Sequence, residues 1–425
     1  MRIAIIGAGC SGIAALKQLT RTGEHEVVCF EQNDRIGGNW VFTTDVGHSS
    51  VCETTHIISS KRLSQYSDFP MPEEYPDYPS HDQILAYFES YVEYFGLMQH
   101  IRLHTKVEKA IPAEGGRWKL YVAGSDEAQD YDLLLVANGH HSVPRHARIF
   151  GQFTGEYLHS HSYKQNLPFK GKRVLVIGGG NSACDCAVEC SRVAKSVTIS
   201  MRRPHYIVPK FMMGKPTDTF NDTLRYVPEV LADVIRRKSL ALQIGTYEDY
   251  GLQSPEFPLT KDHPTVNSEL LYMLRHGKVT ARPGIELVEN LSVSFTDGTT
   301  EEFDVIIGAT GYKIATPFFD PDLLDYTEAD RIPLYLRMFH PEIKNLIFIG
   351  LVQPQGAVWP LSEAQGKLVA SYVDGAWKLP ANLKLLAEAE ADRIAKEFLP
   401  GKRHTVEVHF KPYLDQLLKE IKKAV

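Results

Sequence analysis

The chain has 425 residues, a length that predicts two or three domains. Apolar residues make up 43% and charged residues 23%, as in ordinary globular proteins, so a large core can form without disulfides or metals. The net charge of −6 leaves no basic excess for binding nucleic acid or an anionic membrane.

Cysteine usage and hydropathy predict a cytoplasmic protein. The six cysteines form no C-x-x-C pair and no zinc spacing, and we expect them to be small buried residues in a reducing compartment. The N-terminus enters a strand at once, without a signal-peptide pattern. No apolar run reaches eighteen residues, so we expect no membrane span. Residues 413–423 have an amphipathic pattern that favours a packed surface helix over a membrane-binding one.

A strand, a glycine-rich turn and a helix open the chain. Residues 2–6 are apolar, residues 7–12 read Gly-Ala-Gly-Cys-Ser-Gly, and a helical run follows. In such a turn the first glycine permits the tight bend, the second lets the backbone approach a pyrophosphate, and the third packs helix on strand. The helix N-terminus then offers its free N–H groups to phosphates. The pattern predicts a dinucleotide site.

The residues that follow indicate which dinucleotide binds there. The strand at 26–30 ends in Glu31, whose carboxylate suits free ribose hydroxyls and repels a 2′-phosphate. Farther on, Gly37 and Gly38 permit close backbone approach, and Trp40 offers a flat apolar wall. We interpret this as an FAD site, because a tricyclic ring suits it better than a nicotinamide. The alternative is a glycine turn with a core tryptophan.

The same arrangement occurs a second time. Residues 173–177 form a strand, residues 178–183 read Gly-Gly-Gly-Asn-Ser-Ala, and the next strand leads to Arg202. Arg202 follows Gly178 at the offset, 24 residues, at which Glu31 follows Gly7. An arginine there can grip a 2′-phosphate through its bidentate fork, with Arg203 in support. The second site is therefore predicted to bind NADP.

Alternating strands and helices predict parallel sheets with helices on both faces. The predicted fold class is α/β with two dinucleotide-binding Rossmann-like domains, the FAD domain being discontinuous with the NADP domain inserted in it. We expect the FAD domain in residues 1–168 and 281–425, where it ends in C-terminal helices. The NADP domain is expected in 169–280, with a proline-containing insertion of helices and loops at about 211–267.

Two further patterns support this organisation. Residues 131–140 and 303–312 are similar buried strands ending in small-residue turns, and each would close one dinucleotide domain where the chain crosses toward the other. Asp297-Gly298 between two short strands predicts a hairpin.

After the strand that ends at Gly350, Gln353 is expected to lie near the flavin, and Trp359 is either a pocket wall or a core residue.

Several motifs together resemble a known family. Residues 153–163 fit F-x-G-x-x-x-H-x-x-x-Y/F at every fixed position, directly before the second glycine-rich turn. With Gly37-Gly38-Asn39-Trp40, Asp68-Phe69-Pro70 and Ala309-Thr310-Gly311-Tyr312, the chain resembles the class B flavin-containing monooxygenases over nearly its whole length. Tyr163 favours the N- and S-oxygenating branch, because Baeyer–Villiger relatives usually have Trp there. The chain lacks the long C-terminal anchor of mammalian members and so resembles the soluble microbial type.

The resemblance implies the residues that hold the cofactors. FAD binding is expected at Gly7, Gly9, Ser11, Gly12, Glu31, Gln32, Gly38, Trp40, Val107 and Gln353. NADP binding is expected at Gly178, Gly180, Asn181, Ser182, Arg202 and Arg203, and Thr310 and Gly311 complete the cofactor-binding set. His159 of the motif is expected to be a structural linker. We expect no catalytic side chain and no metal ligand, because the flavin carries the chemistry.

One departure from the family concerns the flavin's surroundings. Members commonly have an Asn close to the flavin, shortly before a Ser/Lys segment and the D-F-P element. Ile58 stands at that place here and cannot donate an amide hydrogen bond. An alignment shifted by two residues would bring His56, a donor, to the same place.

The resemblance implies an NADPH- and O2-dependent monooxygenase. It would insert one oxygen atom into an amine nitrogen or a sulfide sulfur through a C4a-hydroperoxyflavin, protected by bound NADP⁺ and a dry pocket. The alternatives are an NADPH oxidase that releases hydrogen peroxide, Baeyer–Villiger oxygenation of ketones, and a non-catalytic flavoprotein that signals redox state. The expected partners are a small amine or sulfide, O2 and a second copy in a homodimer. The physiological substrate, the coupling efficiency and the preference for NADPH over NADH stay open.

Overall fold

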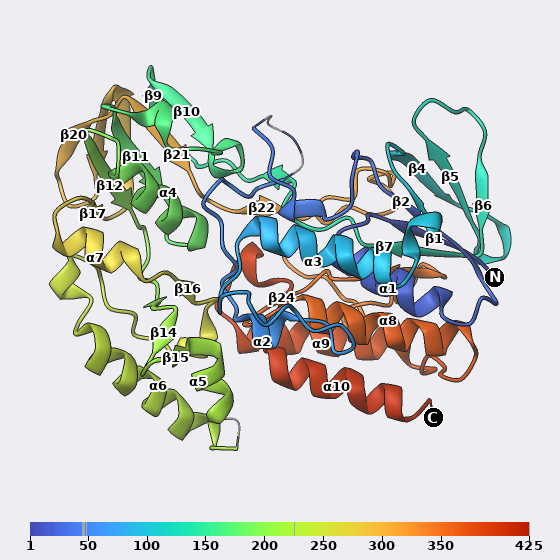
Figure 1. Cartoon of the computed structure of the whole chain (residues 1–425). Helices are drawn as coiled ribbons and strands as arrows, with labels where there is room; N and C mark the ends of the chain where they lie inside the picture. Colours follow the sequence, from blue (N-terminus) through green and yellow to red (C-terminus); the bar gives the residue numbers. More distant parts are fainter. Residues whose placement is uncertain (45–46, 48, 225, 425) are drawn as a thin grey trace. The chain divides into compact units, whose positions relative to one another are not determined.

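The computed structural model describes residues 1–44, 47, 49–224 and 226–424 (Figure 1). The chain divides into two compact units. Unit 1 comprises Met1–Val41, Lys61–Val143 and Lys313–Val425, and unit 2 comprises Phe42–Ser60 and Pro144–Tyr312. No helix in the described part of the chain is long and apolar enough to cross a membrane.

Unit 1 is built on a parallel sheet of five strands in the order β23-β7-β1-β2-β3. These strands are β1 (Arg2–Ile6), β2 (Glu26–Phe30), β3 (Ile101–Arg102), β7 (Leu133–Val136) and β23 (Leu346–Phe348). The central strands are apolar runs because helices cover both faces of such a sheet. Helix α1 (Cys10–Thr20) packs closely against α8 (Trp359–Val373), although the two are far apart in sequence.

The rest of unit 1 comprises short sheets and helices. An antiparallel sheet contains β4 (Val107–Pro112), β5 (Trp118–Val122) and β6 (Gln129–Tyr131), and β24 (Gln353–Pro354) pairs with β25 (Glu407–Val408). The remaining α-helices are α2 (Lys61–Ser64), α3 (His81–Tyr94), α9 (Leu383–Glu397) and α10 (Phe410–Lys422). Helix α10 packs on α8 and buries Tyr413 and Leu417, which confirms the predicted packed surface helix.

Unit 2 repeats the parallel architecture in the order β10-β21-β11-β12-β17. Its strands are β10 (Glu156–His159), β11 (Arg173–Ile177), β12 (Ser196–Ser200), β17 (Thr280–Arg282) and β21 (Val305–Gly308). Helix α4 (Asn181–Ser191) follows β11 and packs against α7 (Glu269–Arg275). The core of unit 2 contains four of the six cysteines, which are buried as predicted. In unit 1, Cys29 is buried as well, but Cys10 is partly exposed at the start of α1, so the prediction is wrong for that residue.

A second sheet and an insertion complete unit 2. The sheet contains β9 (Gly151–Phe153), β18 (Ile285–Asn290), β19 (Ser292–Phe295) and β20 (Thr300–Glu302). Strands β19 and β20 are antiparallel around Asp297-Gly298, which confirms the predicted hairpin. The insertion contains β13 (Ile207–Val208), β14 (Phe211–Met212), β15 (Lys215–Pro216), α5 (Thr217–Thr223), α6 (Glu229–Ile244) and β16 (Thr265–Val266).

The α/β class and the discontinuous first domain are confirmed, but the structure divides the chain at other positions than the predicted 168/169 and 280/281. Unit 2 also takes residues 42–60, 144–168 and 281–312. The reason is strand pairing, because β10 and β21 hydrogen-bond into the sheet of β11. Two of the unit boundaries fall within β8 (Val143–Pro144) and β22 (Tyr312–Lys313), shortly after the two repeated strands, and the other two flank residues 42–60.

Candidate functional site: two glycine-rich turns

The first glycine-rich turn lies at the carboxyl ends of β1 and β7 and leaves no room for side chains. Gly7 has φ +103°, and a Cβ there would lie 2.6 Å from the carbonyl oxygen of Ala137. A Cβ on Gly12 would lie 1.8 Å from the carbonyl oxygen of Gly7. Helix α1 starts directly after Gly9, which provides no side-chain cap, and its first turn holds no acid. The free N–H groups of this helix are therefore suited to a phosphate.

The Gly37-Gly38 turn lies against the first glycine-rich turn. The N–H of Gly37 donates to the carbonyl oxygen of Ala8 at 3.1 Å, and a Cβ on Gly38 would lie 3.1 Å from the Cα of Gly9. Two predicted FAD-binding segments therefore meet in the structure. Gly38 must be glycine, since any side chain there would push the two backbone segments apart.

Trp40 is half-buried and packs edge-on against Trp359, with 5.7 Å between ring centroids. Trp359 is only 5% exposed and also packs on Phe88. Of the two roles open for Trp359, the structure favours the core residue.

Glu31 is buried at the end of β2 and organises the backbone around the turn. Its Oε2 accepts the N–H of Ala8 at 2.8 Å, and its Oε1 accepts the backbone N–H and the side-chain amide of Asn33 at 3.0 and 2.6 Å. A carboxylate has about four lone-pair sites, so about one remains for a ribose hydroxyl. Gln32 is exposed beside it.

The start of β4 runs alongside Glu31. The N–H of Thr105 donates to the carbonyl oxygen of Glu31 at 2.8 Å, two residues before Val107. The side chain of Val107 is buried in the core of unit 1, so this residue can face a ligand only through its backbone.

Gly350 presses the end of β23 onto the start of α1. It has φ +72°, and a Cβ there would lie 2.0 Å from the Oγ of Ser11. The Oγ atoms of Ser11 and Ser362 are 2.8 Å apart, and the N–H of Gly350 donates to the Oε1 of Gln365 at 2.8 Å. Gln353 lies three residues on, in β24, where its N–H donates to Val406 at 2.7 Å.

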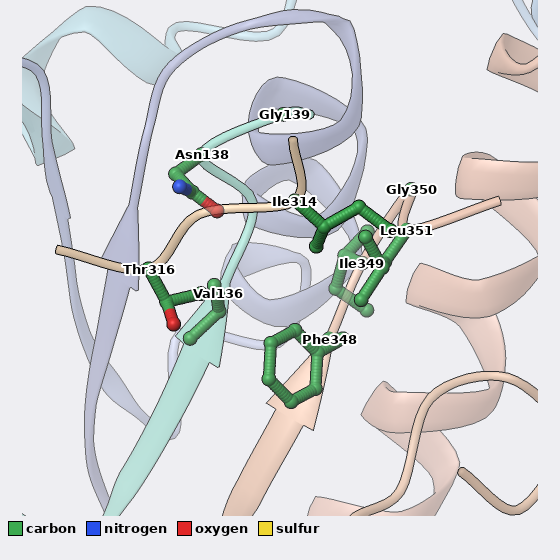
Figure 2. Close-up of a pocket in the computed structure, with 9 residues that line it drawn as sticks. All are labelled: Val136, Asn138, Gly139, Ile314, Thr316, Phe348, Ile349, Gly350 and Leu351. Atoms are coloured by element: carbon green, nitrogen blue, oxygen red, sulfur yellow. The ribbon is translucent and has the colours of Figure 1, made fainter. Parts of the chain in front are cut away.

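A small cavity of about 10 Å³ opens at the carboxyl ends of β7 and β23 (Figure 2). It is lined by Val136, Asn138, Gly139, Ile314, Thr316, Phe348, Ile349, Gly350 and Leu351. This volume suits a single water and is too small for a cofactor ring. Burial lowers the pKa of the neighbouring His140 to about 4, so this ring is neutral at physiological pH.

The second glycine-rich turn has the same geometry at the ends of β11 and β21. Gly178 has φ +140°, and a Cβ there would lie 2.3 Å from the carbonyl oxygen of Ala309. Helix α4 starts directly after Gly180, again without a side-chain cap or an acid in its first turn. Ser182 is exposed, but the Oδ1 of Asn181 accepts the N–H of Val266 at 2.7 Å. The side chain of Asn181 thus ties the turn to β16.

Arg202 and Arg203 are exposed just beyond the end of β12. Neither guanidinium pairs with a carboxylate in the described part of the chain, so both are available to an anion. Thr310 and Gly311 lie in the turn after β21. The Thr310 hydroxyl donates to the carbonyl oxygen of Arg145 at 2.5 Å, and the Arg145 N–H donates to Gly311 at 2.9 Å. The polar groups of this turn are used within unit 2.

His159 has the surroundings of a structural residue. It is 2% exposed, its Nδ1 accepts the N–H of His161 at 3.1 Å, and its ring packs edge-on against Tyr312. Burial, with His146 and His161 nearby, lowers its pKa to about 4. A buried neutral imidazole with these contacts suits the predicted linker role.

Ile58 and His56 lie in the 42–60 segment and line a second cavity, of about 120 Å³, within unit 2. Asp185 lies on the opposite wall, where burial raises its pKa to about 6 and the amide of Asn267 donates to it at 2.8 Å. Ile58 supplies no hydrogen-bond donor to this space, as expected from its side chain.

The sequence reading missed residues that hold these segments in place. Ser362 and Gln365 form hydrogen bonds at Ser11 and Gly350 because α8 packs on α1. No local sequence pattern predicts that contact. Lys164 and Asp218 hold the 42–60 segment. A signal existed for Lys164, since it directly follows the 153–163 motif.

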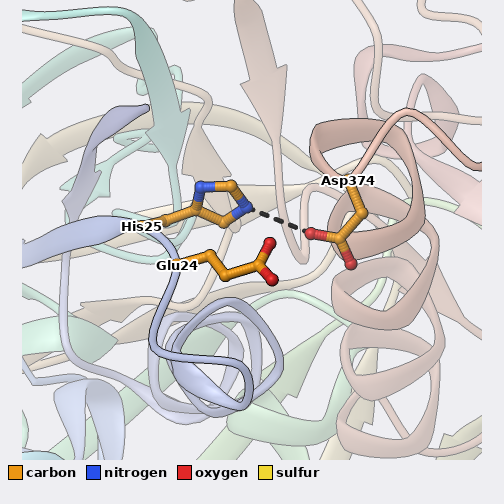
Figure 3. A group of neighbouring side chains, drawn as sticks. All are labelled: Glu24, His25 and Asp374. Atoms are coloured by element: carbon orange, nitrogen blue, oxygen red, sulfur yellow. Dashed lines mark hydrogen bonds and ion pairs between the residues drawn. The ribbon is translucent and has the colours of Figure 1, made fainter.

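Glu24, His25 and Asp374 form the one group of potential metal ligands in the described residues (Figure 3). The Nε2 of His25 lies 3.0 Å from one oxygen of Asp374, and Arg21 donates to the other at 3.0 Å. An arginine on the shared carboxylate disfavours a cation. We interpret the group as a surface ion-pair cluster of unit 1.

Comparison with known proteins supports the resemblance to flavin-containing monooxygenases. The family model described as flavin-binding monooxygenase-like matches residues 1–424. The chain is 34% identical to flavin-containing monooxygenase 5 of Rattus norvegicus, over 96% of this chain and 80% of the relative. It is 33% identical to the N-oxide-forming dimethylaniline monooxygenase 2 of the same species, over 99% and 82%.

Two solved structures share the fold. S-allyl-L-cysteine S-oxygenase from Allium sativum is 24% identical, with a TM-score of 0.73 over 99% of this chain and 88% of that one. An open structure of cyclohexanone monooxygenase is 17% identical, with a TM-score of 0.73 over 98% and 97%.

The chain thus combines two Rossmann-type units with the sequence of a flavin-dependent oxidoreductase. It belongs to the flavin-binding monooxygenase-like family. Membership confirms the predicted family, the enzyme class and the cofactors FAD and NADP(H).

Proposed function

We propose that the protein is an NADPH- and O2-dependent monooxygenase that transfers one oxygen atom to an amine nitrogen or a sulfide sulfur. The observation that carries the proposal is the opposite charge after two similarly built glycine-rich turns, Glu31 in unit 1 and Arg202 in unit 2. One turn suits a free ribose and the other a 2′-phosphate. A single chain thereby holds a flavin and its reductant.

The residues of unit 1 fit FAD. The side-chain-free space at Gly7, Gly9 and Gly38 admits a pyrophosphate close to the backbone, and the start of α1 offers N–H groups to it. Glu31 has acceptor capacity left for the adenosine ribose. We assign Ser11, Gly12, Gln32, Trp40, Val107 and Gln353 to the same site.

The residues of unit 2 fit NADPH. Gly178, Gly180 and Ser182 lie at the start of α4, which suits the pyrophosphate, and the free guanidinium of Arg202 suits the 2′-phosphate, with Arg203 in support. Asn181, Thr310 and Gly311 shape the turn through their own hydrogen bonds.

When bound, FAD would supply the hydride-accepting and dioxygen-activating chemistry, and NADPH would supply the reducing equivalents. The protein binds and orients both dinucleotides and keeps water from the reacting atoms. No acid, base or nucleophile is needed from the chain, and the neutral rings of the partly buried His140 and the buried His159 fit that expectation. Names of similar proteins, which include an N-oxide-forming and an S-oxygenating enzyme, support soft nucleophiles as substrates.

The second candidate function is an NADPH oxidase that releases hydrogen peroxide. Ile58 favours it, because the family's amide donor is replaced by an aliphatic side chain. Baeyer–Villiger oxygenation is less favoured by Tyr163. Our proposal also includes a cytoplasmic location and a homodimer, which fractionation and light scattering test.

The deciding experiment measures NADPH consumed, oxygenated product and hydrogen peroxide with a tertiary amine, a thioether and a cyclic ketone. We expect product to account for most NADPH with the amine or the thioether. Peroxide equal to NADPH under every condition would establish the oxidase instead. Ile58→Asn should lower the peroxide share, whereas the matched change Ile58→Val should leave it as it is.

A further inference from the structure

The segment 42–60, which we call the strap, leaves unit 1 and returns to it. Its neighbours Val41 and Lys61 belong to unit 1, yet the strap itself belongs to unit 2. It carries Ile58 and His56, either of which the alignment can set at the place of the family's flavin-proximal Asn. It also lines a cavity together with residues of α4, whose start is the proposed NADP site, so the contacts that hold the strap in unit 2 bear on that site.

Lys164 holds the middle of the strap. Its side chain is buried, with 7% of the residue exposed, and its Nζ donates to the carbonyl oxygens of Ser49 at 2.6 Å and Val51 at 3.4 Å. The carbonyl oxygen of Lys164 accepts the N–H of Glu53 at 3.0 Å. A buried ammonium is costly without acceptors, so these carbonyl oxygens and Lys164 depend on each other.

Two further hydrogen bonds hold the two ends. The Nε2 of His161 donates to the carbonyl oxygen of Gly47 at 2.8 Å. The N–H of Ser60 donates to the Oδ2 of Asp218 at 2.6 Å. His161 belongs to the 153–163 motif and Lys164 follows it directly, so the motif and its next residue bind Gly47, Ser49 and Val51 of the strap.

The second half of the strap borders a cavity, although Ile57 within it is buried. Thr54, Thr55, His56 and Ile58 line the strap side of the 120 Å³ cavity, opposite Asp185. Close packing fixes a segment in most protein interiors, but it is incomplete here. The position of residues 54–58 therefore depends in part on the hydrogen bonds that hold the strap on either side.

We infer that Lys164 is a positioning residue, which binds backbone carbonyls of the strap and thereby places residues 54–58 against α4, the helix whose start is the proposed NADP site. The inference rests on the proposed function and adds a role for the residue after the motif. Lys164 acts through the strap and contacts no cofactor itself.

The test compares Lys164→Met with Lys170→Met, an exposed lysine six residues on. Loss of a hydrogen-bonded buried ammonium should speed amide hydrogen exchange in the described strap residues about tenfold or more, while residues 173–200 keep their rates. FAD content should be unchanged, because unit 1 is untouched. KM for NADPH should rise about tenfold and more than kcat falls. Lys170→Met should behave as wild type.

A conservative variant and a second site separate positioning from general stability. Lys164→Arg keeps a charged donor and should restore most of the slow exchange. If Lys164→Met does not fold, Asp218→Ala releases the other end of the strap and should speed exchange at Ser60 and its neighbours. Exchange in the strap equal to that of Lys170→Met, or raised equally throughout unit 2, would overturn the inference. Absence of oxygenated product in the wild type would instead overturn the proposed function, and the exchange result would still decide the role of Lys164.

Discussion

Each of the two units of this protein is built around a glycine-rich turn. The units differ in the residue that follows the next strand, Glu31 in unit 1 and Arg202 in unit 2. Gly7 and Gly178 both adopt positive φ against an alanine carbonyl, of Ala137 and Ala309, at the end of the neighbouring strand. At the other end of these strands, Asp132 and Asp304 each accept the N–H of an arginine, Arg2 or Arg173, at 2.7 Å. The repeated scaffold is therefore a matter of backbone hydrogen bonding and steric exclusion.

The difference lies in burial. Glu31 accepts three hydrogen bonds from its own unit, whereas the guanidinium of Arg202 is exposed and unpaired in the described part of the chain. The acid is thus part of the scaffold as well as of the proposed ribose site. The arginine makes no such contact in the described part of the chain and is available to the proposed 2′-phosphate. Substitutions at the acid should disturb the unit itself, and substitutions at the arginine should change only cofactor choice.

The largest effect is expected where the two turns differ in steric room. Gly12→Ala places a methyl group 1.8 Å from the carbonyl oxygen of Gly7, so the turn must distort, and purified protein should contain almost no FAD. The matched change Ala183→Gly removes a buried methyl group and should cost only about 1 kcal/mol in the free energy of unfolding. Flavin absorbance per protein and thermal midpoints measure both. Normal FAD content in Gly12→Ala would contradict the model of the turn.

Arg202→Gln should change cofactor choice without changing the scaffold. Loss of a charged hydrogen-bonded contact to a 2′-phosphate should raise KM for NADPH about 10- to 100-fold and leave KM for NADH nearly constant. Arg203→Gln should do the same to a smaller extent. Steady-state kinetics with both nucleotides measure the ratio. An equal loss with NADH and NADPH would show that Arg202 does not read the 2′-phosphate.

Glu31→Gln should weaken FAD binding by about tenfold or more, because the amide group must face a backbone N–H or the Asn33 amide with a donor. Titration of the apoprotein with FAD, followed by flavin fluorescence, measures the affinity. Glu26→Gln, an exposed change on the same strand, is the control. Unchanged affinity in Glu31→Gln would remove the acid from the proposed site.

The smallest effect concerns Asp304, which accepts the N–H of Arg173 at the start of β11. Hydrogen bonds from Arg173 hold the pKa of Asp304 at about 2, below its usual value. The ionised form is thus favoured by folding, and its contribution is present above about pH 4 and lost as pH falls toward 2. The ion pair of Arg173 and Asp304 is partly exposed. Asp304→Asn should therefore lower the free energy of unfolding by at most about 1 kcal/mol, and only above about pH 4. Thermal midpoints from pH 2 to 6 measure the loss, and an equal loss at pH 2 and pH 6 would contradict the linkage.

Local patterns in the sequence were sufficient for the glycine-rich turns, the contrast of Glu31 and Arg202, and the hairpin at Asp297-Gly298. Each depends on residues close together in the chain, where φ, charge and turn chemistry act directly. The domain boundaries were not predictable in the same way. They depend on β10 and β21 joining the sheet of β11, and strand pairing over more than a hundred residues has no local signal.

The sequence by itself determined the two dinucleotide folds and the charge that distinguishes them, because glycine conformation and side-chain charge are properties of single residues. The tertiary structure alone decided that Trp359 is a core residue, that the side chain of Asn181 is tied to β16, and that Lys164 holds the strap. These roles arise when distant segments pack, since burial and hydrogen-bond partners are set by neighbours in space rather than along the chain.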